Sequence, residues 1–358
     1  MLATKTRAVH SALPLTQAEK DRYIAGWLLF CCFIIFCMVV LGGVTRLTGS
    51  GLSMVQWEPI MGILPPLSQQ EWQHTFALYQ ASPEFIHKNN HMTLGDFKGI
   101  FWFEYAHRLL GRTIGLIFFI PMLIFFMKGW VVSSLKPKLI VMFILGGLQG
   151  LLGWYMVKSG LVNDPHVSQY RLTAHLGMAF VIVAYIFWVA LGLLNQNKVN
   201  ASDEHSGAVK RSITFITSII FITILSGGFV AGTKAGFAYN TFPLMDGKLI
   251  PDGLFSLEPF ARNFFENIIT VQFDHRLLAT IVFVSVISFW FYLRRKNLSS
   301  QTQIALNLML VTVFLQVALG ISTLVLSVPI ALGAAHQGGA LLLFTSALYV
   351  LYTMRRGL

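Results

Sequence analysis

Eight long apolar runs divide this chain, and no other feature of the sequence restricts its fold as strongly. A spanning α-helix needs roughly 20 predominantly apolar residues to cross the hydrocarbon core of a bilayer, and each run is long enough. We therefore predict an all-α polytopic membrane protein with eight transmembrane helices. The runs cover residues 24–46, 99–127, 138–158, 169–194, 212–233, 264–293, 302–326 and 329–353.

Composition points the same way. Of 358 residues, 55% are hydrophobic and only 11% are charged, and the mean hydropathy is +0.66. The net charge is +11, but the basic residues lie at the ends of the apolar runs, which favours a role in orientation and excludes a nucleic-acid partner. The cysteines Cys31, Cys32 and Cys37 all fall in the first run, so we interpret them as packing residues rather than disulfide or metal-site residues.

Basic residues mark alternate ends of the runs and predict the orientation. With eight spans they all fall on one side, so both termini are expected on the cytoplasmic side of a bacterial inner membrane, or in the matrix for a mitochondrial protein. The first run has no small-residue cleavage pattern after it and is interpreted as an anchor. The basic residues are Lys5, Arg7, Lys20, Arg22, Lys128, Lys136, Lys138, Lys198, Lys210, Arg211, Arg294, Arg295, Lys296, Arg355 and Arg356.

Two long connections lie on the other side, at residues 47–97 and 234–263. Connections of this length are usually functional. In the first, Trp72, Phe76 and Tyr79 follow a Ser68 cap at helical spacing. This pattern predicts a short amphipathic helix at the outer membrane interface.

The two halves of the chain repeat each other. EYAHRLLGR (104–112) returns as QFDHRLLA (272–279), LQGLLG (148–153) as LQVALG (315–320), and AHLGMA (174–179) as AHQGGA (335–340). The order predicts two tandem four-helix bundles that insert the same way and are related by a pseudo-twofold axis along the membrane normal. The expected parts are a cytoplasmic segment 1–23, a first half 24–195, a cytoplasmic linker 196–211 and a second half 212–358.

Four histidines occur in repeat register, one on every second expected helix: His107, His175, His275 and His336. They lie roughly two to three turns below the outer helix ends and so form one layer. Such groups are costly inside a membrane unless they serve a function. Two facing imidazoles are suited to holding a haem iron, so two pairs predict two haem sites. Hydrogen-bonded packing is the alternative, and zinc or copper fits less well because no further ligands recur beside the histidines.

Only the first copy has a carboxylate on the same helix face as its histidine. Glu104 precedes His107 by three residues, and Gln272 precedes His275 by the same spacing, so each shares a helix face with its histidine. A buried carboxylate in one half only suggests general-base chemistry or stabilisation of positive charge, although pairing with His107 or Arg108 is a structural alternative. Arg108 and Arg276 follow the histidines directly and are expected to point off that face. Asp274 is expected to serve packing or an arginine.

These motifs resemble the haem A synthase family over nearly the whole chain. The segments that carry the resemblance are GGVTRLTGSGLSMVQWEPI (42–60), EYAHRLLGR (104–112), GLQGLLGWYMVKSGL (147–161), GGFVAGTKAGFAYNTFP (227–243) and VQFDHR (271–276). The long first outer loop is similar to the mitochondrial and proteobacterial branch. The branch with a cysteine pair in its outer loops differs, since this chain has none there.

The resemblance implies an enzyme that oxidises a ring methyl of haem O to a formyl group, through hydroxylated intermediates, to give haem A for terminal oxidases. His275 and His336 would ligate a resident haem B, with Gln272 beside them. His107 and His175 would flank the substrate haem O, and Glu104 would match the family's required acid. Candidate partners for the haem propionates are Arg46, Lys158, Arg171 and Lys234, any of which could equally be an interfacial anchor.

The implied partners are the haem O synthase (protohaem farnesyltransferase), oxidase assembly factors, an unidentified electron donor and the bilayer; a homo-oligomer is left open. Two other classes were weighed. A dihaem membrane cytochrome b that only transfers electrons would explain the histidines but not the Glu104/Gln272 difference. A two-repeat transporter would explain the duplication, but it usually shows interrupted helices or midplane charges, and we find neither in the sequence.

Overall fold

The computed structural model describes residues 15–56, 63–160, 167–195 and 207–356. Within these ranges it contains helices and no strand, and eight of the helices are long and apolar enough to cross a membrane. The predicted all-α membrane fold is therefore confirmed. The eight are α1 (Gln17–Leu47), α3 (Leu94–Met127), α4 (Lys136–Gly160), α5 (Gln169–Leu194), α6 (Gly207–Thr233), α8 (Ile268–Leu293), α9 (Ser300–Val325) and α10 (Ile330–Arg356).

Several boundaries differ from the prediction because polar residues cap the helices. The side chain of Thr16 accepts a hydrogen bond from the Glu19 N–H and Glu19 caps Thr16 in return, so α1 begins at Gln17 and includes residues 17–23 of the segment expected before it. The run expected at 264–293 is interrupted at Asn267, whose side chain caps α8 and separates it from the short α7 (Asn263–Glu266). Helix α6 likewise begins inside the expected linker 196–211, at Gly207. Lys5, Arg7 and Lys198 lie outside the described residues.

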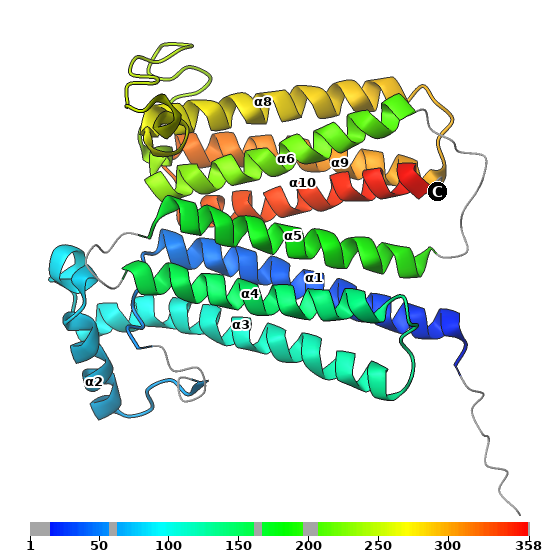
Figure 1. Ribbon diagram of the computed structural model, residues 1–358. Helices are drawn as coiled ribbons and strands as arrows, with labels where there is room; N and C mark the ends of the chain where they lie inside the picture. The colour runs from blue at the N-terminus through cyan, green and yellow to red at the C-terminus, as the bar shows by residue number, and fades with distance from the viewer. Residues whose placement is uncertain (1–14, 57–62, 161–166, 196–206, 357–358) are drawn as a thin grey trace, which may run out of the picture.

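The helix pairs of the first half recur in the second (Figure 1). Helix α1 packs on α3 and α5, and α6 packs on α8 and α10 in the same way. Helices α3 and α4 are matched by α8 and α9, and α4 and α5 by α9 and α10. The halves meet through α1 with α10 and α5 with α6. The pseudo-twofold axis and the exact domain limits stay predictions, and this set of pairs agrees with them.

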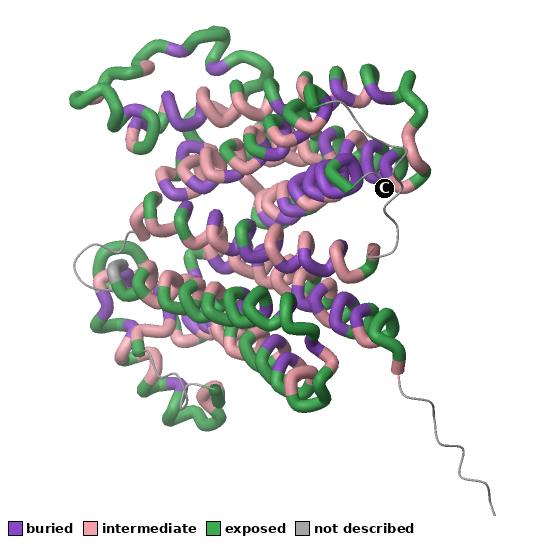
Figure 2. Tube along the Cα trace, turned by 45° about the vertical axis from the view of Figure 1, so that its right-hand side comes forward, coloured by how far each residue is buried: buried purple, intermediate pink, exposed green. Residues whose placement is uncertain are grey.

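Small residues let the two halves approach closely. Gly43 on α1 faces Gln337 on α10, whose amide donates to the Val39 carbonyl at 2.8 Å. At the other contact, Gly228 on α6 faces Thr173 on α5. Close backbone approach at glycine is the usual way to pack helices in lipid, where the hydrophobic effect does not drive association. Buried residues accordingly concentrate on α5 and α10, whereas α4 is largely exposed (Figure 2).

The helix expected after Ser68 is present as α2 (Gln69–Gln80), with Ser68 and Glu71 forming a capping box. Its position at the outer membrane interface stays a prediction, and its apolar face packs on α3. Trp72 and Tyr79 are buried against Phe97 and Phe101, because α3 extends beyond the bundle and offers them an aromatic surface. Helix α2 and the other long connection lie at one end of the bundle, and both ends of the described chain lie at the opposite end (Figure 1).

Candidate functional site

Each of the four histidines faces a glycine on the spanning helix that comes before its own. These helices are α1 for His107, α4 for His175, α6 for His275 and α9 for His336. A Cβ at any of these glycines would lie closer to the imidazole Cε1 atom than ordinary van der Waals contact allows. A larger residue would therefore push against the ring. The separations would be 3.0 Å for Gly42 and His107, 2.9 Å for Gly153 and His175, 3.1 Å for Gly227 and His275, and 2.8 Å for Gly320 and His336. The same device thus holds all four rings.

A glutamine supports the last histidine of each half. Gln149 Nε2 donates to the backbone carbonyl of His175 at 3.0 Å, and Gln316 Nε2 donates to that of His336 at 3.0 Å. In the first half the Gln149 amide also approaches His175 Nε2, at 3.5 Å. Both glutamines hold the helix backbone at the histidine, so the two rings have matched positions.

The polar environment of the rings is sparse. Ser226 Oγ lies 2.8 Å from His275 Nδ1 and fixes that ring. The Nδ1 atoms of His107, His175 and His336 are buried without a hydrogen-bond partner among the described residues. Buried polar atoms are normally satisfied, and exceptions call for an explanation such as a functional role or a bound group.

His275 and His336 face each other with ring centroids 6.4 Å apart and planes at 87°. A metal ion held between two imidazole nitrogens at about 2 Å each separates the ring centres by roughly 6 Å. The separation therefore fits an iron between the rings, and the Ser226 contact would set the orientation of one ligand. The residues present fit a haem in the second half.

Glu104 is buried and fully engaged. Its Oε2 accepts hydrogen bonds from Ser53 Oγ at 2.6 Å and from the Met54 N–H at 2.7 Å. Its Oε1 accepts from Arg108 Nε at 3.0 Å and from Arg108 Nη2 at 2.5 Å. Arg108 also donates to the carbonyls of Met54 and Gln56. The pair therefore fastens the start of the outer loop to α3.

The expectation that Arg108 points off the Glu104 face is wrong. Four residues return a helix to nearly the same side, so Glu104 lies between His107 and Arg108 in projection and the long arginine reaches it. Arg276 behaves similarly and donates to the carbonyls of Tyr239 and Thr241. Asp274 makes no hydrogen bond or ion pair with any residue in the described ranges, so the arginine partner considered for it is not found there.

Gln272 has the position of Glu104 and the opposite hydrogen-bonding role. Its Nε2 donates to the carbonyls of Ala235 at 2.9 Å and Tyr239 at 3.1 Å. The loop of the second half presents acceptors to Gln272, whereas the loop of the first half presents donors to Glu104. The acid and the amide are thus each matched to the loop that they hold.

The candidate propionate partners lie near the loop end of the bundle. Arg46 lies in the last turn of α1, and its side chain makes no hydrogen bond or ion pair with the described residues. Lys158 Nζ lies 4.9 Å from the Trp154 ring centre, and Arg171 stacks 4.5 Å from that of Tyr155. Lys234 is exposed, with φ of 58°. The guanidinium of Arg46 has no aromatic or polar partner among the described residues, and Arg46 is partly buried. None of the other three candidates meets both conditions.

Sequence reasoning did not single out the four facing glycines, the two glutamines or Ser226. A signal was available, because Gln149 and Gly153 in LQGLLG align with Gln316 and Gly320 in LQVALG. The repeat indicated which residues recur. It could not indicate which helix face each one meets.

Comparison with known proteins gives one family. A family model described as cytochrome oxidase assembly protein, COX15-CtaA, matches residues 25–348. A heme A synthase of Nitrosospira multiformis is 54% identical over 97% of this chain and 98% of its own length. One from Nitrosomonas eutropha is 52% identical over 98% and 99%, and the human heme A synthase COX15 is 44% identical over 96% and 85%. The chain belongs to the haem A synthase family.

Proposed function

We propose that this protein is a haem A synthase, an integral membrane oxidoreductase that oxidises a ring methyl of haem O to the formyl group of haem A. Full-length relatives named heme A synthase support the activity. Substrate haem O would occupy the first half, between His107 and His175. A resident haem B would occupy the second half. The glycine and histidine pairing repeated at four positions supports two sites, and the single observation that carries this placement is Glu104 in the first half where the second half has Gln272.

His275 and His336 are the proposed ligands of haem B. Their ring separation suits one iron, and Gly227 and Gly320 leave room for both imidazoles. Haem B, when bound, would supply an iron centre that exchanges single electrons. Ser226 and Gln316 would hold the two ligands in place, and Gln272 would close the loop above them.

Glu104 is the proposed catalytic carboxylate of the first half. A carboxylate has about four acceptor sites, and here four hydrogen bonds already reach it. This arrangement favours a fixed negative charge over a base that must take up a proton. A preorganised charge can stabilise positive charge that develops at the substrate during oxidation. His107 and His175 would orient the substrate, with Gly42 and Gly153 setting their rings.

The remaining assignments rest on position. Arg46, Lys158, Arg171 and Lys234 are proposed propionate partners, with Arg46 favoured because its guanidinium has no other partner in the described chain. The haem sites would face the outer side of a bacterial inner membrane, with the termini on the cytoplasmic side. Haem O would come from a haem O synthase and haem A would pass to oxidase assembly factors.

The pigment extracted from purified protein tests the proposal. The enzyme predicts haem B together with haem O or haem A. A dihaem cytochrome b that only transfers electrons predicts haem B alone, and a transporter predicts no haem. The relatives reported above give no support to the cytochrome alternative, since their names are those of heme A synthases.

A further inference from the structure

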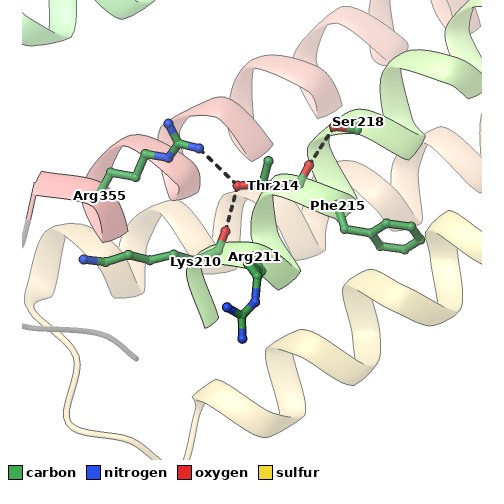
Figure 3. A pocket seen from close by; sticks show the side chains of 6 residues that line it. All are labelled: Lys210, Arg211, Thr214, Phe215, Ser218 and Arg355. Carbon is green, nitrogen blue, oxygen red and sulfur yellow. Dashed lines mark hydrogen bonds between the residues drawn. The ribbon is translucent and has the colours of Figure 1, made fainter. Parts of the chain in front are cut away.

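A cationic cavity opens between α6 and α10, at the end of the bundle away from the histidines (Figure 3). Its volume is about 440 Å³, and it is shallow and open on one side. Lys210, Arg211 and Arg355 line it together with Thr214, Phe215 and Ser218. Among the described residues, no acidic side chain lines the cavity and none of its three cations forms an ion pair.

We propose that this cavity binds the phosphate headgroup of an anionic phospholipid. The three cations come from the first turns of α6 and the last turn of α10, and so lie where spanning helices leave the hydrocarbon. Cationic pockets between helices at this level are suited to acidic lipid headgroups. The site is separate from the proposed haem chemistry and does not depend on it.

The hydrogen bonds decide which groups are available to a phosphate. Thr214 and Ser218 donate their hydroxyl hydrogens to the carbonyls of Lys210 and Thr214, at 2.7 and 2.9 Å. Arg355 Nη2 donates to Thr214 Oγ1 at 3.4 Å, which directs its guanidinium toward α6. The remaining N–H groups of Arg355, with those of Lys210 and Arg211, are the phosphate donors.

The apolar part of the site favours a lipid over a free ion. Phe215 is 58% exposed and lies one helical turn from Arg211. Ile222, two turns further into the span, is 50% exposed on the same side of α6. An acyl chain below the headgroup would cover both side chains, whereas inorganic phosphate would leave them bare.

Native mass spectrometry of the full-length protein in detergent tests the site, with phosphatidylglycerol and phosphatidylcholine as probes. Each cation near an anionic headgroup contributes about fivefold in affinity, so removing three weakens phosphatidylglycerol binding roughly 100-fold. The test variant is Lys210→Gln/Arg211→Gln/Arg355→Gln. The control is Arg22→Gln/Lys128→Gln/Lys136→Gln, which removes the same charge at the same end of the bundle but outside the cavity.

We expect one tight phosphatidylglycerol on the wild type and the control, and its loss from the test variant. Phe215→Ala should weaken the binding of both lipids by the same factor and keep the preference for phosphatidylglycerol. Retained haem absorbance shows that each variant is folded. Equal losses in test and control, equal binding of phosphatidylcholine, or displacement by inorganic phosphate at matched ionic strength would each overturn the proposal. If the test variant kept its lipid binding but lost haem A formation in cells, the three cations would be assigned to a protein partner instead.

Discussion

Arg108 donates two hydrogen bonds to Glu104, at 3.0 and 2.5 Å, in a pair whose side chains are 8% and 3% exposed. The other carboxylate oxygen of Glu104 accepts hydrogen bonds from Ser53 and Met54 of the outer loop. In the second half, Gln272 holds its loop by donating to carbonyls instead. The Glu104 carboxylate, which Gln272 replaces in the second half, therefore has a structural role, and any catalytic role acts from this fixed position.

Replacing Glu104 with Gln separates the two roles. An amide cannot accept from both the loop and Arg108, so one buried donor is left unsatisfied, at a cost of about 1–3 kcal/mol in folding free energy. Loss of a preorganised charge typically lowers a rate by about 10²–10³-fold. We expect haem A formation in cells to fall by that factor while the haem B absorbance of the purified protein stays.

Ser53→Ala is the matched control for Glu104→Gln. It removes one loop contact but leaves the carboxylate paired with Arg108. We expect it to keep most haem A formation, with faster amide exchange in residues 50–56. Normal haem A formation in Glu104→Gln would contradict the catalytic assignment. An equal loss of haem A formation in Ser53→Ala would show that Glu104 acts only by holding the outer loop.

His336→Ala should abolish haem B binding, because the 6.4 Å pair with His275 would lose one ligand. His107→Ala should retain haem B and lose bound haem O or haem A. The measurement is the reduced absorbance spectrum of purified protein together with extracted pigment. An intact haem B spectrum in His336→Ala would show that the cofactor is not held in the second half.

The facing glycines allow a test that leaves every histidine in place. A Cβ at position 320 would lie 2.8 Å from His336 Cε1, so Gly320→Ala must displace the ring. Overpacking of this kind costs about 1–3 kcal/mol, which corresponds to roughly 5- to 100-fold in haem B occupancy. Gly153→Ala should act in the same way on the first site, through His175.

Gly150→Ala on the same helix α4 is the control, since a Cβ there meets nothing within 4 Å. Alanine is otherwise the better helix former by about 1 kcal/mol. Both variants therefore gain helix stability, and only Gly153→Ala disturbs a histidine. Equal pigment content in the two would refute the proposal that these glycines position the rings.

Much of the fold could be predicted because membrane burial leaves a simple pattern. Apolar runs gave the eight spans, and the Ser68 and Glu71 cap gave α2. The Thr16–Glu19 capping box is equally visible in TQAE and could have set the start of α1. The interruption at Asn267 depends on a side chain that bonds to two backbone N–H groups, which apolar periodicity does not reveal.

The site was predictable in its residues but not in its contacts. The repeat indicated the four histidines and the Glu104/Gln272 difference. The Glu104–Arg108 pair was one of two structural alternatives for the acid, and the repeat did not indicate that loop donors meet an acid in one half and loop acceptors meet an amide in the other. Those facts depend on the path of two long connections, for which the sequence has no periodic signal.

The buried acid Glu84 predicts that the outer loop is sensitive to pH. It is 7% exposed and accepts a hydrogen bond from Tyr79 Oη at 3.2 Å, and Asn89 donates to Tyr79 in turn. Burial raises the pKa of Glu84 from 4.5 to about 7. The hydrogen bond from Tyr79 and the charge of Lys88 oppose this shift, and the charge of Glu104 adds to it.

Because the folded loop holds a proton that the unfolded loop releases, the stability contributed by neutral Glu84 is complete below pH 4.5 and is lost as the pH rises to about 7. We expect the outer loop of the wild type to be cleaved faster by protease, relative to Glu84→Gln, as the pH increases across this window. The ratio of the two cleavage rates at each pH cancels the protease's own pH dependence. Tyr79→Phe removes the donor that opposes the raised pKa and should move the transition to higher pH. A wild-type to Glu84→Gln ratio that stays constant from about pH 5 to about pH 8 would show that Glu84 does not titrate in the folded loop.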